Sequence, residues 1–368
     1  MSTIKVDTIR NYDSAVDFSQ GFKLGGADVV QNYTESADMP ETPTPVNGDY
    51  WWDTANEVLY RYMDGGFRAL GVAASGIAWG GNRALVTGNQ GVHIDYFDMT
   101  GTSNAADFGD LSGAYNSNDR GVSNSSRAIF TRQVSTSMDY VAIATPGNGT
   151  DFGDLIDTDR GQAPCSDGTY GVMGGGYGAI ITAGYKNSIF YVTIATPSNA
   201  TDFGDRTITG GYASGAGNAT RGLFFGVFTN SSPQTSNVID YVTIASPGNA
   251  TDFGDLSYSS GFNAAASDAT RAVCATGTDS VASTNRNNID YVTVATTGNA
   301  TDFGDLTVAK DDSSACGNGT RVVFNGGNTG SNVNTVEYIT VQTTGNATDL
   351  LDLTAASSRT TSCAGNAS

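Results

Sequence analysis

The chain has 368 residues, of which 37 are Asp or Glu and 18 are Lys or Arg, so its formal net charge at pH 7 is −19. A surface with that charge repels phosphate backbones and anionic lipid, which argues against nucleic acid and membrane surfaces as partners. Only 15% of the residues are charged while 47 are glycine, a composition typical of short strands joined by tight turns, so we expect an all-β chain.

Residues 1–38 contain only short β-like pieces, such as residues 4–9 and 15–18, with glycines between or after them. These pieces are too short and too polar to build a core alone, so we expect an extended N-terminal arm that another chain orders, through homo-oligomerisation or docking to a larger assembly. Residues 39–48 hold three prolines and are typical of a semi-rigid linker. No stretch approaches about 18 consecutive apolar residues, so membrane insertion is not expected.

One phrase recurs six times between about residue 75 and the C-terminus, most clearly as IDYVTIASPGNATDFGDL at residues 239–256. Twelve positions after its Tyr comes a Phe in five copies and Leu350 in the last. The six tyrosines are Tyr96, Tyr140, Tyr191, Tyr241, Tyr291 and Tyr338. A fixed spacing over that many copies indicates a repeat array.

Each repeat predicts four antiparallel strands. They are a short apolar strand, a strand that ends near Gly-Gly, the Thr-rich strand that holds the Tyr, and the Asp-Phe-Gly-Asp-Leu strand after a tight turn. In the last strand Phe and Leu are three residues apart, which breaks the alternation of a pleated strand. The Gly between them can absorb the extra residue as a bulge, so we expect a bulge in every repeat that has this Gly.

Four-stranded units of about 45–50 residues, repeated without a helix, are typical of a β-propeller. The pattern resembles kelch repeats, which have an apolar strand ending in Gly-Gly, a Tyr in the following strand, and an aromatic residue with an apolar one three positions later. Phe replaces the Trp more usual in kelch. The resemblance covers about residues 75–368 and implies the fold, but not the function, because propellers serve as binding modules and as enzymes.

The spacing of the repeats also bears on how the ring closes. The C-terminal residues 361–368 supply only one first strand, which leaves a blade that lacks three. Three short strands are expected just before the repeats, within residues 49–70. We therefore predict a seven-bladed kelch-like propeller over residues 49–368, whose closing blade combines residues 49–70 with 361–368 and removes the open edges. The alternative is six blades plus a separate hairpin.

Two N-terminal segments carry a second resemblance. The sequence GDYWWDT at residues 48–54, followed by Gly65-Gly66-Phe67, resembles a Trp-rich hairpin of tail-fibre and other virion proteins of tailed bacteriophages. The opening MSTIKVDTI is similar to the starts of such proteins, especially those of marine cyanobacterial phages. The resemblance implies a virion location, with residues 1–38 docked onto other virion proteins. Trp51 and Trp52 themselves are more simply explained as packing aromatics.

The repeated Asp-Phe-Gly triplet matches the metal-binding motif of protein kinases, but five copies in a β context without a phosphate-binding loop indicate a structural role. Its aspartates could bind calcium; a more ordinary role is to hydrogen-bond the turn or to pair with the recurrent arginines. These are Arg83, Arg127, Arg221, Arg271 and Arg321. His93, the only histidine, has no second histidine for a metal or triad site. We predict no catalytic residue, no cofactor and no metal site.

The cysteines and the Asn-Ala-Thr triplets both follow the repeat. Cys165, Cys316 and Cys363 fall at one position of three repeats where the others carry small apolar residues, so core filling is expected rather than a disulfide framework. The triplets match glycosylation acceptors, but they recur at hairpin turns, where Asn tolerates left-handed backbone geometry. They begin at residues 199, 218, 249, 299 and 346.

The loop between the second and third strands varies most in length among the repeats. In a propeller it shares a face with the loops that join neighbouring blades, and variation on one face is typical of a recognition surface. Drift in unconstrained loops would produce the same pattern. The candidates for stacking on a sugar ring are Tyr177, Tyr185, Tyr212 and Phe262.

Several functions remain open. The leading one is a phage appendage of the tail-fibre type that displays the propeller for attachment to a host-surface polysaccharide. A capsid or tail decoration without a receptor role is a second. A propeller-based polysaccharide-degrading enzyme is a third, and its site would need acids that depart from the repeat, such as Asp157, Asp159, Asp311 and Asp312. An intracellular kelch-type interaction module is disfavoured by the N-terminal resemblance.

Overall fold

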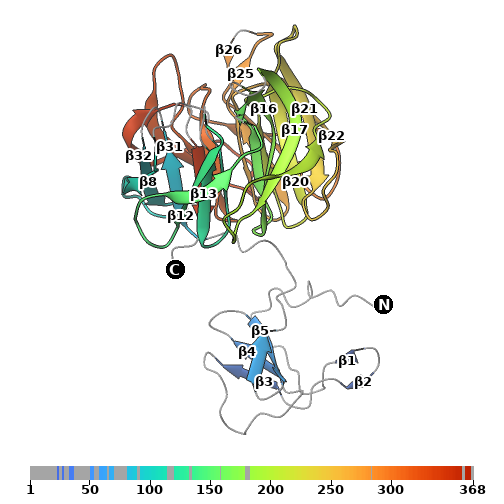
Figure 1. Ribbon diagram of the computed structural model, residues 1–368. Coiled ribbons are helices and arrows are strands. Elements are labelled where there is room, and N and C mark those ends of the chain that lie inside the picture. Colours follow the sequence, from blue (N-terminus) through green and yellow to red (C-terminus); the bar gives the residue numbers. More distant parts are fainter. Residues whose placement is uncertain are drawn as a thin grey trace. The chain divides into compact units, whose positions relative to one another are not determined.

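The computed structural model contains two compact units, residues 1–75 and 76–368 (Figure 1). It describes the strands between residues 23 and 69, and residues 81–365 apart from short gaps. The gaps are residues 89–91, 114–119, 132–134, 158, 179–182, 283 and 359–360. The described elements are all strands, so the described residues include no helix long and apolar enough to cross a membrane.

In the first unit, β1 (Lys23–Leu24) pairs with β2 (Ala27–Asp28), and four strands form a sheet in the order β3-β4-β5-β6. They are β3 (Tyr33–Ser36), β4 (Tyr50–Asp53), β5 (Val58–Met63) and β6 (Gly66–Ala69). The β3–β4 pair is parallel and the other two pairs are antiparallel. The three strands predicted between residues 49 and 70 are therefore present. The β-like pieces at residues 4–9 and 15–18 lie outside the described residues.

The second unit is a β-propeller of six blades, each built on a four-stranded antiparallel meander (Figure 1). Blade 1 comprises β33 (Thr361–Gly365), β7 (Arg83–Thr87), β8 (His93–Asp98) and β9 (Ala106–Asp110). Blade 2 comprises β10 (Gly121–Ser123), β11 (Arg127–Thr131), β12 (Ser137–Ala142) and β13 (Thr150–Asp154). Blade 3 comprises β15 (Ala163–Ser166), β16 (Tyr170–Gly178), β17 (Gly184–Thr193) and β18 (Thr201–Asp205), with the extra strand β14 (Asp159–Arg160).

The remaining three blades follow the same order. Blade 4 comprises β19 (Ser214–Gly217), β20 (Arg221–Phe228), β21 (Thr235–Thr243) and β22 (Thr251–Ser260). Blade 5 comprises β23 (Ala264–Ser267), β24 (Arg271–Ala275), β27 (Asn288–Thr293) and β28 (Thr301–Asp305), with a small hairpin of β25 (Thr278–Asp279) and β26 (Thr284–Asn285). Blade 6 comprises β29 (Ser314–Gly317), β30 (Arg321–Asn325), β31 (Val333–Thr340) and β32 (Thr348–Ser357).

The seven-bladed ring is not confirmed, because the C-terminal strand closes blade 1 instead. β33 pairs with β7 along its whole length, from Thr361 opposite Thr87 to Gly365 opposite Arg83. It therefore supplies the first strand of the blade that β7, β8 and β9 complete. Residues 49–70 contribute to the separate sheet of the first unit. The structure thus has the six blades of the alternative arrangement, and residues 49–70 belong to a separate four-stranded sheet instead of a hairpin.

The core lies between neighbouring blades rather than within one blade. One cluster of buried side chains joins Leu85 and Ile94 of blade 1 to Phe130 of blade 2. Another joins Val323 of blade 6 to Phe97 of blade 1, which closes the ring. Because each blade buries its faces only against its neighbours, the ring is one cooperative unit.

The predicted bulge is confirmed in all five repeats that have the Gly. The register between the third and fourth strands shifts there, and φ of these glycines lies between 137° and 148°. They are Gly109, Gly153, Gly204, Gly254 and Gly304. A Cβ on any of them would lie within 2.4–2.5 Å of a backbone atom in the next blade. Glycine is needed both for the backbone angle and for this close approach. Blade 6 has the same register shift without a glycine.

The Asn of the turn between the third and fourth strands joins neighbouring blades. Asn299 Oδ1 of blade 5 accepts a hydrogen bond from the Asp255 N–H of blade 4, and the Ala300 N–H donates to the Asp255 carbonyl. The same contact recurs at all six interfaces, and Asn104 of blade 1 accepts from Asp352 of blade 6. These asparagines do not have positive φ. The expected left-handed turn is therefore wrong, and the Asn is used for its side-chain oxygen.

Each recurrent Arg stacks on the Tyr of its own blade and reaches the next blade. The Arg221 guanidinium lies 4.6 Å from the centre of the Tyr241 ring, which meets Phe253 edge-on at 5.8 Å. Arg221 also donates a hydrogen bond to a carbonyl at the end of the third strand of blade 5. Arg321 of blade 6 bonds the Met99 carbonyl of blade 1 in the same way. These arginines therefore hold neighbouring blades together instead of pairing with the repeated aspartates.

The acidic residue before the repeat Tyr caps the fourth strand of the preceding blade. Asp290 accepts hydrogen bonds from the N–H and the hydroxyl of Ser257. The equivalent pairs are Asp95 with Thr354, Asp139 with Ser112, Asp240 with Thr207, and Glu337 with Thr307. In blade 3, Phe190 replaces the acid and the partner position is Ile156. Both members of this pair depart from the repeat together.

Core filling by the cysteines is confirmed for Cys165 and Cys316, and the side chain of Cys363 lies outside the described residues. Cys165 and Cys274 are buried and free, and Cys316 is buried. Burial raises the pKa of the Cys165 and Cys274 thiols well above the ordinary value.

These two thiols are expected to react with iodoacetamide on the order of 100-fold more slowly in native buffer than in denaturant, because both access and thiolate population are low. Mass spectrometry of the peptides that contain Cys165 and Cys274 measures the two rates. Equal rates in both conditions would contradict the buried placement.

Candidate functional site

The four aromatic residues proposed from the sequence lie in one patch, with Phe228 as a fifth member. The Tyr177 and Tyr185 rings are in edge contact at 5.1 Å, and the Tyr212 and Phe262 rings are stacked at 4.5 Å. Phe228 is 6.2 Å from Tyr185 and 5.4 Å from Phe262. All five side chains are partly exposed. We call these five residues the aromatic patch.

The patch lies on the face of the propeller formed by the loops between second and third strands and between blades, here called the loop face. Tyr177 and Tyr185 are cross-strand partners in the β16–β17 hairpin. β16 has nine residues and β17 ten, against five and six for the same strands of blade 2. Because of this extra length, the two rings lie beyond the part of the meander that blade 3 shares with blade 2. Phe228 is the last residue of β20 and forms a β-bridge with Gly211.

Tyr212 and Phe262 stand at equivalent positions before the first strands of blades 4 and 5. Both have left-handed backbone, with φ of 54° and 59°. The equivalent residues of blades 3 and 6, Gly161 and Asp312, have φ of 68° and 54°. In this series each N–H donates to the carbonyl of the preceding member, from Asp312 back to Gly161. The closed propeller thus imposes a left-handed backbone conformation at this position. For a bulky residue this conformation costs about 1 kcal/mol or more.

The patch includes tyrosine hydroxyls and lies against a cation. The Arg160 guanidinium of β14 lies 5.0 Å from the centre of the Tyr177 ring. Burial raises the pKa of Tyr185 to about 12, and the neighbouring Tyr212 and Tyr177 hydroxyls contribute to the rise. The Tyr185 phenol therefore stays protonated at neutral pH and can donate a hydrogen bond to a ligand oxygen.

A buried ion pair supports the interface between blades 3 and 4 beside the patch. Arg206 replaces the Leu of the other repeats and donates to Asp240 at 2.8 Å, and both side chains are fully buried. The Arg206 guanidinium also lies 5.3 Å from the centre of the Phe224 ring. Removing one partner of such a pair leaves an uncompensated charge and costs about 3–5 kcal/mol. Arg206 therefore fixes the blades that carry the patch.

The acids considered for an enzymatic site are placed at different blade interfaces. Asp157, between blades 2 and 3, forms an ion pair with Lys186 at 3.2 Å. Asp311, between blades 5 and 6, accepts a hydrogen bond from Thr278. The side chain of Asp159 lies outside the described residues. Among the residues with described positions, no group of three or more His, Cys, Asp or Glu side chains is placed to hold a metal ion.

The first strands of neighbouring blades pack closely around the propeller axis. A Cβ on Gly215 of β19 would lie 2.4 Å from the Pro164 carbonyl oxygen of β15. The Ser267 hydroxyl of β23 donates to the Gly217 carbonyl and accepts from the Gly217 N–H. The first strands of blades 3, 4 and 5 are therefore in direct contact with one another.

Sequence reasoning missed Phe228, Arg160 and Arg206. Phe228 ends a strand that has no charged or polar side chain after Arg221, so its exposure gives no signal in the sequence. Arg206 stands where every other repeat has Leu, including Leu353 in blade 6. A charged residue at this otherwise apolar position was the available signal. Arg160 reaches the patch only because β14 pairs with β16, which the repeat does not predict.

The six-bladed propeller shows the fold but not the function, because propellers serve many functions. The function has to be inferred from the side chains on the surface. The aromatic patch is the part of that surface which departs from the repeat. No protein-family model matches the chain, and no curated protein matches its sequence.

Proposed function

We propose that this protein is a virion appendage of a tailed bacteriophage, of the tail-fibre type, whose propeller attaches to a host-surface glycan through the aromatic patch. Residues 1–38 dock onto other virion proteins, and the chain forms a homo-oligomer. The resemblance of the N-terminal segments to phage proteins supports the virion location. The patch supports the binding role.

The observation that carries the binding role is the conformation of Tyr212 and Phe262. Gly161 fills the same position in blade 3, so the fold itself requires no aromatic ring there. Two large side chains are kept in a strained backbone conformation, stacked on each other and partly exposed. Strain retained at a surface site points to function, and flat apolar rings are suited to stacking on a sugar.

The arrangement of the propeller suits display. The described propeller begins and ends on the face opposite the loop face, since Arg83 pairs with Gly365 there. The patch lies on the other face of the propeller, away from both of these described ends.

The double substitution Tyr212→Gly with Phe262→Gly tests the proposal. Glycine relieves the strained backbone while the ring contacts, worth about 0.5–1.5 kcal/mol each, are lost, so the free energy of unfolding is expected to change little. Binding is expected to fall at least about 30-fold, the effect of truncating central aromatic anchors. Glycan-array binding and adsorption to host cells provide the measurement.

Val308→Ala serves as the matched control, because Val308 is exposed on the same face in blade 5 and does not belong to the patch. It is expected to bind like the parent protein. Normal adsorption by the double glycine variant would favour a decoration protein without a receptor role. Absence of the protein from purified particles would contradict the virion location.

A further inference from the structure

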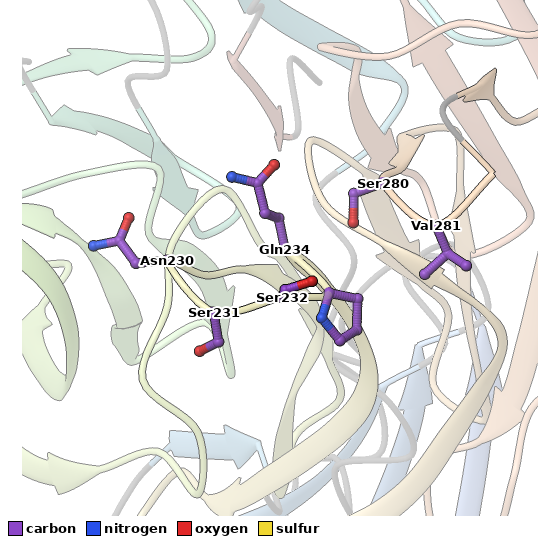
Figure 2. A pocket seen from close by; sticks show the side chains of 7 residues that line it. Asn230, Ser231, Ser232, Gln234, Ser280 and Val281 are labelled. Carbon is purple, nitrogen blue, oxygen red and sulfur yellow. The ribbon is translucent and has the colours of Figure 1, made fainter.

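A polar groove lies on the loop face, and Figure 2 shows the side chains that line it. Its volume is about 550 Å³, within the range of roughly 300–1,000 Å³ typical of small-ligand sites. One wall is the β20–β21 loop, with Asn230, Ser231, Ser232, Pro233 and Gln234. The other wall is the turn after β25, with Ser280 and Val281. Figure 2 shows the side chains of the two loops on opposite sides of the groove.

Both walls are continuous with the patch. Asn230 follows Phe228 by two residues along the chain. Gly261, which precedes Phe262, forms a β-bridge with Thr278, and Ser280 comes two residues later. The groove and the stacked rings therefore form one continuous surface across blades 4 and 5.

Hydrogen bonds hold the two walls together. The Thr235 N–H donates to the Ser280 hydroxyl, and the Ser280 N–H donates to the Thr235 hydroxyl. Asp279 accepts from Arg286 and from the N–H groups of Val281 and Ala282. Burial alone would raise the pKa of Asp279, but these bonds outweigh it and the pKa lies below its usual value. The groove is therefore fixed before a ligand arrives, which reduces the entropy lost on binding.

The groove offers uncharged hydrogen-bonding groups only. All seven lining residues are neutral, and five of them are Asn, Gln or Ser. The amides of Asn230 and Gln234 are exposed and form no hydrogen bond with the described residues. Each amide presents both donors and an acceptor, which matches sugar hydroxyls. Carboxylate, sulfate or phosphate groups would instead meet a chain of net charge −19 with no cation in the groove.

We propose that this groove is a second subsite, which takes uncharged sugar residues of the same chain that stacks one ring on the aromatic patch. The ligand is accordingly a neutral linear polysaccharide that spans blades 3–5. This inference rests on the proposed glycan-binding function and specifies its substrate class.

The test compares oligosaccharides of increasing length, neutral and acidic, for binding to the full chain on one array, followed by titration calorimetry. Asn230→Ala with Gln234→Ala removes the groove amides, and Thr329→Ala with Ser331→Ala removes polar groups from the corresponding loop of blade 6. The first variant is expected to bind long neutral chains about tenfold more weakly while its affinity for disaccharides stays within about twofold. The control is expected to match the parent protein.

The outcomes separate the two proposals. If the parent protein binds no carbohydrate, the proposed function fails and the subsite fails with it. If it binds, but the Asn230→Ala/Gln234→Ala variant keeps full affinity for long chains, the subsite alone is overturned. Preference for acidic over neutral chains would likewise overturn the neutral class, as would capture of an extended peptide in competition with the sugar.

Discussion

The substitution Gly254→Ala is expected to lower the midpoint of thermal unfolding by roughly 5–10 °C. Gly254 has φ of 148°, and an added Cβ would lie 2.4 Å from the Gly298 carbonyl oxygen of the next blade. The Gly298 N–H donates to the Phe253 carbonyl at 2.8 Å, so the turn cannot move away without losing that bond. Backbone strain and steric overlap together cost about 3–5 kcal/mol in free energy of unfolding.

Gly298→Ala places the same methyl group on the other side of the same contact. No atom lies within 4 Å of its added Cβ, and Gly298 does not have positive φ. The thermal unfolding midpoint of the Gly298→Ala variant is expected to stay within about 1 °C of that of the parent protein, as for ordinary surface substitutions. Differential scanning calorimetry of both variants measures the contrast. Equal midpoints for the two variants would show that the bulge does not pack on the neighbouring turn.

Features that depend on local spacing could be predicted from the sequence. The four strands of each repeat follow from β-branched runs and tight turns, and the bulge follows from Phe and Leu three residues apart. Both depend on the two-residue period of a strand, which one repeat is enough to define.

Features that depend on contacts between blades could not be predicted. The asparagine of each turn was explained by its own backbone, whereas its oxygen bonds the preceding blade. The number of blades depends on which strand β33 pairs with. A short C-terminal strand fits the edge of β7 and the edge of a hairpin equally well by pattern, and only the shape of the closed ring decides between them.

The candidate site could be predicted in part because departures from a repeat are visible. Tyr177, Tyr185, Tyr212 and Phe262 stand where other repeats differ, and the structure brings them together. Phe228 could not be found in this way, since its position depends on β20 continuing to eight residues, against five for the equivalent strand β24 of the next blade.

Removing residues 359–368, which include β33, is expected to abolish the cooperative unfolding transition of the ring and to cause aggregation. β33 pairs with all five residues of β7 and lies beside β10 and β29. Without it, the edge of β7 is unpaired next to the fully buried Ala84 and Leu85, and exposed edges promote association. Size-exclusion chromatography and thermal melts measure the effect. A synthetic peptide of residues 359–368, added in trans, is expected to restore the transition by strand addition.

Two matched truncations distinguish the six-bladed ring from a ring closed by the N-terminal hairpin. Removing residues 366–368 spares β33, so the melting temperature is expected to stay unchanged. Removing residues 1–75 deletes the whole first unit, and the propeller is expected to melt within about 2 °C of the full chain because no blade loses a strand. If residues 49–70 completed a seventh blade, this truncation would be as damaging as the loss of β33. A propeller that aggregates without residues 1–75 but tolerates the loss of residues 359–368 would contradict closure by the C-terminal strand.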